Sequence, residues 1–547
     1  MKVIQIKLRR ILPGLLFLIF VSCTTNEKSK QIVVGLESDI QTLNPLYTMS
    51  EAEANISELI FLGLVGHDWN SEKGEPISFP VLASQIEWEN DFSSVLITLR
   101  NDVRWENGSE FTVDDIVFSF DLYSDKKVES RFFGTFYNYY LNEDLSINLT
   151  KTFEVINPHK LKINFLPNRN VTYYDFDLPI LPKYLFEKYN RSELATTDKI
   201  KISGGTGPYK VKEFIKSQNV KLSATLTSIF SKPDQIEEVV FKIVPDYTSR
   251  IFQLKNGDID ITEYIKPEDV RELSNLNMFL IKQRKGREYD YLGLKVNFEG
   301  IGKKKANGLF DSQRIRMAIA KSINRKSILK EYLLGNGELM ANLVSPIFTS
   351  LNRSSIPIQY NIDEAKAILD SEGWTDFNND GQIEKKGIPF SFTLSFSASN
   401  LFREYAAIRI QNNLKAVGIN VKLQALEPAV FFEKMFNKEL EAWLAGWSVP
   451  VPLNLKPYWH SDPSIAQGNI SSYKNDRVDG ILDKLDMQLS DNSRRDLIRE
   501  LQEIISADQP VIFLYWIDNS VAINSRLQNV KVSPLATIQK CWEWKIN

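Results

Sequence analysis

The chain has 547 residues, of which 43% are hydrophobic and 25% are charged, and its formal net charge is −3. A chain of this length can bury more apolar surface than a single core organises, so we expect two or more lobes. The lack of a basic excess argues against a nucleic-acid-binding protein, because phosphate backbones are recognised through clustered positive charge, and it argues equally against attraction to anionic lipid surfaces.

The first residues have the composition of an export signal. Four basic residues within the first ten precede an apolar run from Ile11 to Val21, and Ser22 stands directly before Cys23. The run is about half the roughly 20 residues that span a bilayer as a helix, and no comparable run follows. We therefore interpret residues 1–22 as a signal peptide and expect that the mature chain does not cross the membrane.

The order basic, apolar, small, cysteine resembles the lipobox of bacterial lipoproteins, in which the cysteine becomes the lipidated N-terminus. Phe20 departs from the aliphatic residue that is usual at its position. An ordinary signal peptide with an incidental cysteine is the alternative, but the polar segment Thr24 to Lys30 supplies the flexible tether that an anchor needs. The resemblance implies that Cys23 is lipidated and that residues 23–30 hold the protein outside the cytoplasm, at a membrane of the bacterial envelope, with the periplasmic side favoured.

Residues that carry catalysis or bind metals are few. The histidines His67, His159 and His460 form no HxxH or HExxH pattern, and the chain has no GxSxG or GxxxxGK[ST] motif. With Cys23 lipidated, Cys541 has no partner for an intramolecular disulfide. We expect no cofactor and no enzyme. An exported hydrolase is a remote alternative, because it requires convergent acid and base groups that the sequence does not indicate.

The first elements of the mature chain indicate a strand, an irregular loop and a helix. The strand is expected at Ile32 to Leu36, the loop at Asn44 to Ser50, and the helix at Glu51 to Leu64. In open α/β sheets, a loop that leads from a strand into a helix faces the ligand. The loop Asn44 to Ser50 is therefore a candidate for ligand contact.

The next elements are a strand at Val95 to Leu99, a turn at Asn107-Gly108, and a helix that begins after Thr112. Thr112 and Asp115 form an approximate capping box, with Asp in place of the usual Glu, ahead of Ile116 on an apolar helix face. By themselves, these features predict secondary structure and indicate no function.

The segment Leu99 to Phe120 resembles the signature of the family 5 extracytoplasmic solute-binding proteins, the oligopeptide- and dipeptide-binding group of ABC importers. Further landmarks of the family follow in order at Ile180 to Leu185, Gly205 to Tyr209, Leu254 to Asp260, Arg314 to Arg325 and Tyr360 to Trp374. The resemblance covers essentially the whole mature chain.

The resemblance implies an α/β, two-lobed periplasmic-binding-protein type II fold of the large peptide-binding subclass, with an extra domain and hinge-connected mixed sheets. The implied division is residues 31–70, 205–285 and 505–547 for the three parts of lobe I, residues 71–204 for the extra domain II, and residues 286–504 for lobe III.

Two of the landmarks contain glycines whose role is structural. Gly205, Gly207 and Pro208 predict a turn between lobes, in which glycine supplies positive φ and proline fixes the exit. Asn256-Gly257 predicts a helix end before a strand at residues 259–261.

Arg314 and Arg316 lie two residues apart on one predicted helix. Because residues at this spacing face different sides of a helix, they cannot serve one ligand together. We interpret both as solvated or inter-lobe pairs.

Asp376, Asn378, Asp380 and Gly381 match the start of a calcium loop. Position 12 of that loop, which should be a bidentate Glu, is Gly387, although Glu384 stands at position 9. A polar turn and a calcium site therefore remain alternatives here, and we favour the turn.

Function in this family is binding by closure of two lobes around a hinge. Two segments are expected to line the cleft, the loop that ends at Ser50 and the run from Trp443 to Pro450, whose Gly446-Trp447 pair matches a binding segment of the family. Trp443, Tyr289 and Tyr291 fit a buried core as well as they fit the cleft. The expected ligand-binding residues are Tyr47, Thr48, Met49, Ser50, Tyr289, Trp443, Trp447, Ser448 and, more weakly, His460.

One position departs from the family in a way that bears on the ligand. Peptide-binding members commonly carry an aspartate three residues after the tryptophan, where it pairs with the α-amino group of the ligand, but this chain has Pro450. We expect a monomeric receptor that delivers an oligopeptide to an ABC permease. A non-peptide solute, either a sugar or a chelated metal, is the alternative, and the sequence does not distinguish import from sensing.

Overall fold

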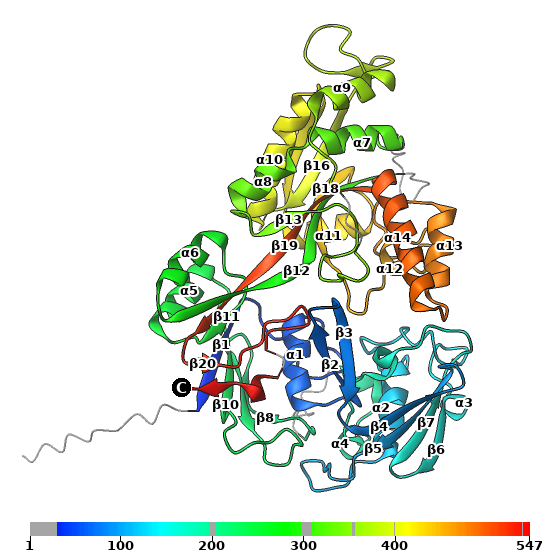
Figure 1. The fold of residues 1–547 in the computed structure, drawn as a ribbon, viewed down its shortest axis with the longest axis vertical. Coiled ribbons are helices and arrows are strands. Elements are labelled where there is room, and N and C mark those ends of the chain that lie inside the picture. The colour runs from blue at the N-terminus through cyan, green and yellow to red at the C-terminus, as the bar shows by residue number, and fades with distance from the viewer. Residues whose placement is uncertain (1–29, 196–203, 297–307, 353–355, 399, 539) are drawn as a thin grey trace, which may run out of the picture.

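The structure is a computed structural model that describes residues 30–195, 204–296, 308–352, 356–398, 400–538 and 540–547. The expected signal peptide and Cys23 lie outside these residues. None of the helices in the described ranges combines the length and the apolar character needed to pass through a bilayer. The chain folds into an upper lobe and a broader lower half, joined by two long strands (Figure 1).

One mixed sheet extends through both parts of the molecule. Its strands are β1 (Gln31–Leu36), β8 (Tyr209–Ile215), β9 (Asn219–Ala224), β10 (Glu238–Ile243), β11 (Ile261–Thr262), β12 (Phe279–Leu294), β13 (Gly337–Leu339), β16 (Ser391–Ser397), β17 (Asn420–Leu426), β18 (Ala442–Ser448) and β19 (Val511–Asn524). Among the described residues, their order is β17-β16-β18-β12-β19-β11-β1-β10-β9-β8, with β13 paired to β19.

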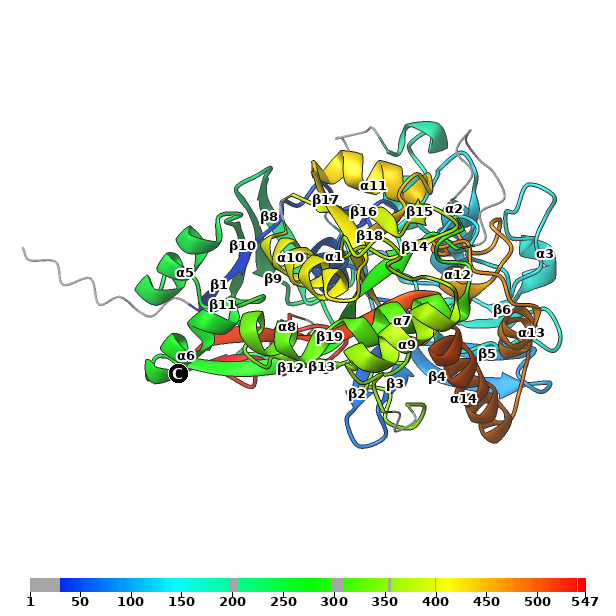
Figure 2. The ribbon, with the colours of Figure 1, turned by 90° about the horizontal axis from the view of Figure 1, so that it is seen from above.

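Strands β12 and β19 connect the two parts. They are 16 and 14 residues long and pair antiparallel over most of their length, side by side as Figure 2 shows. Register shifts between Arg284 and Glu288 and between Asp290 and Tyr291 interrupt their ladder. The lobes therefore share a single sheet, and the longer of the two irregularities, at Arg284 to Glu288, lies in the connection between them.

The upper lobe packs helices on both faces of this sheet. Its helices are α7 (Gln313–Ser322), α8 (Arg325–Tyr332), α9 (Ile362–Ser371), α10 (Leu401–Lys415), α11 (Pro428–Phe436), α12 (Lys456–Trp459), α13 (Asp476–Leu485) and α14 (Asp491–Asp508), and its short strands are β14 (Glu384–Lys385) and β15 (Ile388–Pro389). Because successive residues of a strand point to opposite faces, Leu292 and Leu294 join one buried cluster, while Tyr289 and Tyr291 join another.

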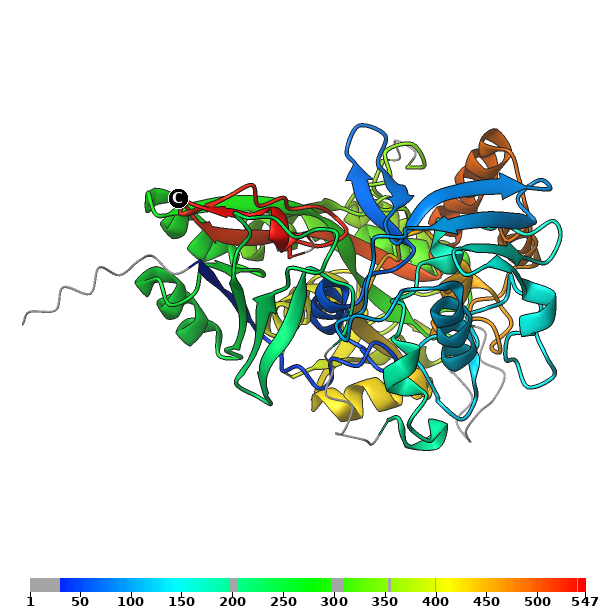
Figure 3. The ribbon, with the colours of Figure 1, turned by 90° about the horizontal axis from the view of Figure 1, so that it is seen from below.

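The lower half has two ends. At one end, β8–β11 lie with α1 (Glu51–Ile60), α5 (Tyr247–Asn256), α6 (Pro267–Asn275), β20 (Leu527–Gln528), β21 (Lys545–Ile546) and the 3-10 helix η3 (Cys541–Glu543). The other end contains β2 (Val65–Asn70), β3 (Glu75–Pro80), β4 (Ala83–Glu89), β5 (Ser94–Leu99), α2 (Val113–Ser124), α3 (Leu149–Thr152), β6 (Phe153–Asn157), β7 (Lys160–Asn164), η1 (Tyr173–Phe176), α4 (Lys183–Phe186) and η2 (Arg191–Glu193). Its four-stranded sheet, β4-β5-β7-β6, is well separated from β8 (Figure 3).

The local predictions for helix ends are largely confirmed. The backbone N–H of Thr112 donates to Asp115 Oδ2 at 3.0 Å, as a capping box requires, and α2 begins at Val113. Helix α5 ends at Gly257, whose φ is 80°. Helix α1 stops at Ile60, four residues before the predicted end, because the chain turns extended at Phe61.

The predicted reason for Gly205 and Gly207 is wrong. Neither glycine has positive φ, whereas their neighbour Gly204 does. A Cβ at Gly205 would lie 1.9 Å from the carbonyl oxygen of Ile60, and one at Gly207 would lie 2.2 Å from that of Leu59. These glycines are required because two backbone segments approach too closely for any side chain.

The prediction for Arg316 is also wrong. Arg314 is exposed and pairs with Glu372 at 2.8 Å, as expected for a solvated pair. Arg316 is buried and donates to four carbonyl oxygens, those of Phe310, Asp311, Asp508 and Gln509, at 2.8–3.0 Å. It therefore satisfies the carbonyl groups at the C-terminal end of α14.

In the turn after Gly373, side-chain oxygens accept hydrogen bonds from the backbone of the turn itself. Asp376 accepts the N–H groups of Asp380 at 3.2 Å and Gly381 at 2.9 Å. Asn378 Oδ1 accepts the N–H of Asp380 at 2.9 Å. These bonds account for the polar turn without a metal ion.

The division of the chain into lobes remains a prediction. Its boundary between residues 285 and 286 falls inside β12, at the register shift. Its boundary between residues 504 and 505 falls inside α14, which continues to Asp508.

Candidate functional site

The segment from Trp443 to Ser448 forms β18, which pairs antiparallel with β12. Tyr289 lies opposite Trp447, and Gly293 lies opposite Trp443. A Cβ at Gly293 would lie 2.0 Å from Cε2 of Trp443, so the absent side chain lets the indole lie across β12. Because alternate residues share one face of a strand, Tyr289, Trp443 and Trp447 lie on one side of the β12–β18 pair.

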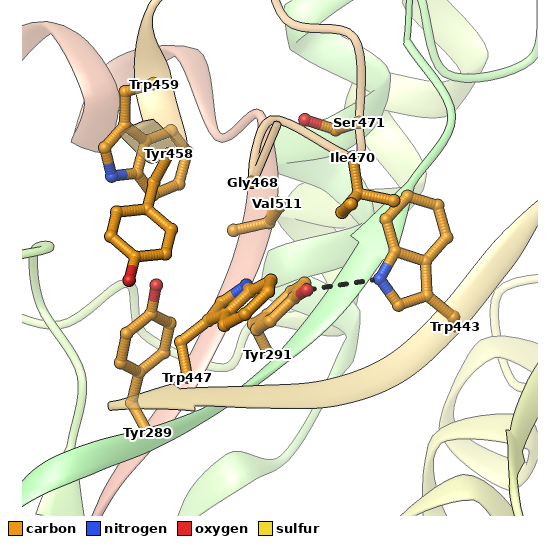
Figure 4. A pocket seen from close by; sticks show the side chains of 10 residues that line it. All are labelled: Tyr289, Tyr291, Trp443, Trp447, Tyr458, Trp459, Gly468, Ile470, Ser471 and Val511. Atoms are coloured by element: carbon orange, nitrogen blue, oxygen red, sulfur yellow. Dashed lines mark hydrogen bonds between the residues drawn. The ribbon is translucent and has the colours of Figure 1, made fainter. Parts of the chain in front are cut away.

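These rings line a cavity that we call the aromatic pocket. It encloses about 290 Å³ of empty space, part of which is open solvent, between β12, β18, β19 and the segment around α12 (Figure 4). Its lining residues are Tyr289, Tyr291, Trp443, Trp447, Tyr458, Trp459, Gly468, Ile470, Ser471 and Val511. As far as the structure describes the chain, this lining carries no charged side chain.

The polar atoms of the aromatic pocket are paired mostly with one another. Trp443 Nε1 donates to Tyr291 Oη at 3.3 Å. The hydroxyls of Tyr289 and Tyr458 point toward each other (Figure 4), and Trp447 makes an edge contact with the Tyr458 ring at 5.4 Å. Burial raises the pKa of Tyr291 to about 12, which keeps its hydroxyl neutral. The pocket therefore offers ring faces and edges, which suit an apolar group.

The two tryptophans of β18 differ in how deeply they are buried. Trp443 is 1% exposed and forms an inner wall, whereas Trp447 is half-buried and reaches the solvent side. Tyr458 and Trp459 were not predicted from the sequence as residues that line a pocket. A pattern that indicates them was present, since two aromatic residues directly precede His460 in a segment otherwise rich in polar residues.

His460 lies outside the aromatic pocket, and its role in ligand binding stays a prediction. Its Nδ1 accepts the backbone N–H of Asp462 at 3.0 Å, and its Nε2 lies 3.6 Å from Asp483. The ring is buried and fixes a local turn.

The predicted N-terminal loop presents little of its chemistry to solvent. Tyr47 donates its hydroxyl to the Val128 carbonyl at 2.9 Å, and Thr48 is fully buried. Ser50 caps α1 through the N–H of Glu53 at 3.2 Å. Of the four loop side chains, Met49 alone is strongly exposed, at 85%. The contacts of Tyr47 and Ser50 are scaffold contacts, the Thr48 hydroxyl has no hydrogen-bond partner in the described residues, and ligand binding by the loop stays a prediction.

A second cavity, which we call the hinge pocket, lies at the end of the predicted segment that contains Ser448. It encloses about 250 Å³ of empty space, part of it open solvent, at the register shift of β12. Its lining residues are Arg284, Lys285, Gly286, Arg287, Glu288, Ser448, Ile517, Asn519 and Pro534. Ser448 thus lines this pocket, and Glu51, the residue after the N-terminal loop, contacts it through Arg284 at 2.9 Å.

The charges of the hinge pocket form a network around the buried Arg284. Arg284 lies 2.9 Å from Glu51 and 3.6 Å from Glu263. Tyr264 donates its hydroxyl to Glu288 at 3.3 Å. Burial raises the pKa values of Glu263 and Glu288, and the nearby Arg284 opposes this shift. Sequence reasoning missed the network because its members come from three separate segments, although four charges within Arg284 to Glu288 were visible in the strand.

A serine, a histidine and an aspartate also lie in a row outside both pockets. His67 Nδ1 is 2.9 Å from Ser78 Oγ, and Nε2 is 2.7 Å from Asp177. His67 and Ser78 are direct cross-strand neighbours in the β2–β3 hairpin, and the Tyr174 ring stacks on the imidazole at 3.9 Å. A cross-strand hydrogen bond beneath an aromatic cover explains this row without catalysis.

Comparison with known proteins identifies similar chains. The description "Bacterial extracellular solute-binding proteins, family 5 Middle" matches residues 79–465. The oligopeptide-binding protein AppA of Bacillus subtilis is 28% identical over 529 residues, which cover 94% of this chain and 92% of that protein. The solved structure of B. subtilis AppA in complex with a nonapeptide aligns with a TM-score of 0.75 at 25% identity, covering 94% of this chain and 99% of that one. NikZ from Campylobacter jejuni, solved in complex with Ni(L-His), has the same fold, with a TM-score of 0.76 at 23% identity and the same coverage.

Proposed function

Because the chain belongs to the family 5 bacterial extracellular solute-binding proteins, we propose that it is a receptor that captures an oligopeptide between its lobes and delivers it to an ABC-type import permease. Its fold is the two-lobed periplasmic-binding-protein fold expected from the sequence. The members of the family to which it is similar are solute-binding receptors and not enzymes.

The observation that carries the proposal is the aromatic pocket on the strands that join the lobes. Strands β12 and β19 pass between the two parts of the molecule, so a group held against them lies where closure acts. An uncharged aromatic cavity grips an apolar side chain through ring contacts. The similarity to an oligopeptide-binding protein and to a structure with a bound nonapeptide supports a peptide as the source of that side chain.

The receptor is proposed to act as a monomer held at the membrane by a lipid on Cys23. Residues 23–30 would tether it near its permease, and tethering raises the effective concentration of one partner for the other. Mass spectrometry of the mature N-terminal peptide tests this part. A lipid mass on Cys23, and release of the protein into the soluble fraction by Cys23→Ser, are expected; an unmodified Cys23 in the mature protein contradicts it.

A non-peptide solute is the second candidate. The family's amine-binding aspartate is replaced by Pro450, and Val449 to Pro452 carries no carboxylate. NikZ, which has the same fold, was solved with Ni(L-His). A chelated metal or another small polar solute therefore competes with a peptide for this assignment.

Thermal unfolding with pooled peptides and pooled sugars tests the receptor proposal. A ligand at about 100 times its dissociation constant adds roughly 2.7 kcal/mol to the free energy of unfolding. We expect the peptide pool to raise the melting temperature and Trp447→Ala to reduce the shift. Trp542→Ala is the matched control, because Trp542 is a half-buried ring stacked on Phe230 at 4.9 Å, away from both pockets. If neither pool shifts the midpoint and the mass of any co-purifying ligand is unaffected by Trp447→Ala, the proposal is wrong.

A further inference from the structure

The hinge pocket has hydrogen-bond donors that its own acceptors do not use. Arg284 lies between Glu51 and Glu263, and Glu288 accepts the hydroxyl of Tyr264, so these charges have partners. The remaining polar side chains of the lining belong to Lys285, Arg287, Ser448 and Asn519. They are all donors, or able to act as donors.

Arg287 is a half-buried cation with no carboxylate at ion-pair distance among the described residues, although Glu51 and Glu288 are near enough to oppose the lowering of its pKa. Within the described part of the chain it forms no ion pair, and its hydrogen bond to the Val449 carbonyl is long, at 3.4 Å. Burial lowers its pKa, although a guanidinium keeps its charge at neutral pH. Removing such a group from water is unfavourable unless an anion approaches it.

Asn519 presents an unused donor to the same cavity. It is 7% exposed, and its Oδ1 accepts the backbone N–H of Tyr264 at 2.8 Å. The amide Nδ2 is buried with no hydrogen-bond partner in the described residues, and Asn519 is one of the residues that line the pocket. Buried polar groups in native proteins nearly always have a partner. An unused buried donor in a cavity therefore points to an acceptor that binds there.

Ser448 and Lys285 complete the set. Neither side chain makes a hydrogen bond or ion pair to another described residue, and both line the pocket from its exposed side. Guanidinium, amide and ammonium N–H groups, together with a hydroxyl, thus surround a cavity whose lining, in the described part of the chain, has one carboxylate, Glu288, and that carboxylate already has a donor. A planar carboxylate matches this set, since its two oxygens accept several hydrogen bonds and pair closely with a guanidinium.

We propose that the hinge pocket binds a carboxylate group of the captured solute, with Arg287 as its ion-pair partner and Asn519 Nδ2 and Ser448 Oγ as hydrogen-bond donors. This inference rests on the proposed receptor function and names the chemical class of its ligand. It agrees with Pro450, because a chain without the amine-binding aspartate holds the acidic end of the solute instead of the amino end.

The carboxylate site and the aromatic pocket can be changed separately. They share β12 and β18, but Tyr289 and Trp447 line the aromatic pocket, while the adjacent pair Glu288 and Ser448 lines the hinge pocket. Neighbouring residues of a strand point to opposite faces, so a substitution in one set leaves the other in place.

The test compares a pool of tripeptides having free C-terminal carboxylates with the same pool amidated, by thermal shift and native mass spectrometry on the full mature protein. The free-acid pool is expected to bind more tightly. Arg287→Gln is expected to weaken its binding about tenfold to a hundredfold, as loss of a charged hydrogen-bond donor does, and Arg287→Lys to restore part of it. Arg314→Gln, at an exposed surface pair, is the control. Asn519→Asp provides a second variant, in which the new charge repels the carboxylate.

The outcomes separate this inference from the receptor proposal. If both pools bind equally and Arg287→Gln changes neither, the carboxylate site is wrong while peptide capture stands. If neither peptide pool binds, peptide capture is wrong, and a pool of small mono- and dicarboxylates decides the site. A shift that Arg287→Gln abolishes supports the carboxylate site, and the lack of any such shift overturns it.

Discussion

The aromatic pocket and the hinge pocket lie on the same two strands but differ in how their polar atoms are used. In the aromatic pocket, Trp443 donates to Tyr291, so its lining offers chiefly apolar contact. In the hinge pocket, Arg287 and Asn519 keep unused donors. The comparison teaches that the polar groups on one face of the β12–β18 pair find partners within the protein, whereas those on the other face find all their partners only when a solute is bound. Residues that form the wall of the first pocket should stabilise the ligand-free protein, whereas the unused donors of the second, Arg287 and Asn519, should not.

Trp443→Ala should have the largest effect. The indole is 1% exposed and fills the space above Gly293, so its removal leaves a cavity in the core. The free energy of unfolding should fall by about 3–5 kcal/mol, measured by urea denaturation followed by circular dichroism. Trp542→Ala, which removes a half-buried ring elsewhere, serves as control and should cost less. An equal loss in the two variants would contradict the assignment of Trp443 to the inner wall.

Arg284→Met should have the next largest effect. It leaves Glu51 and Glu263 without their shared cation while keeping a long side chain. Breaking a buried pair costs about 3–5 kcal/mol, and we expect the lower end because Glu51 is 39% exposed. Acidification should recover part of the loss, since protonated carboxyls need no partner. Arg314→Met is the control at an exposed pair, and a loss as small as the control's would argue against a buried network.

Arg287→Met sharpens the comparison, because the expected sign is opposite. This cation has no carboxylate partner among the described residues, so its removal should leave the free energy of unfolding unchanged or higher by about 0.5–1 kcal/mol. Differential scanning calorimetry of the ligand-free protein measures this. A clear loss of stability would mean that Arg287 belongs to the structural network instead of the binding site.

Glu288→Gln should have the smallest effect, and one that depends on pH. Burial raises the folded-state pKa of Glu288 above its ordinary value, so the folded state favours the protonated form. The stability that this group contributes is therefore present below its unfolded-state pKa and is lost as pH rises through the folded-state pKa. The variant should be more stable than the natural protein at pH 7, and the difference should shrink toward pH 4. A difference that grows on acidification would contradict the raised pKa.

Local features of the fold were predictable from the sequence, since neighbouring residues determine them. Thr112 with Asp115, and Gly257, fixed helix ends that the structure confirms. The aromatic segment was likewise visible, because Trp447 and Tyr289 stand in clear strand patterns.

Features that depend on distant segments were not predictable. Arg316 was misread because its acceptors include the carbonyls of Asp508 and Gln509, about 190 residues away, which no local pattern indicates. Gly205 was misread for the same reason, since the obstacle is the backbone of Ile60. The hinge pocket depends on the pairing of β12 with β19, which brings Asn519 beside Arg284.

The interrupted ladder between Arg284 and Glu288 has a mechanical consequence. A regular two-stranded ribbon resists torsion, because each hydrogen bond between its strands limits the rotation of the next. The three residues Lys285 to Arg287 lack that ladder pairing, and Gly286 lies so close to Ile517 that a Cβ would be 1.9 Å from its carbonyl oxygen. Of the two irregularities in this ladder, the one at Lys285 to Arg287 leaves the longer unpaired stretch, and it is the place where twisting of one lobe against the other meets least resistance from strand pairing.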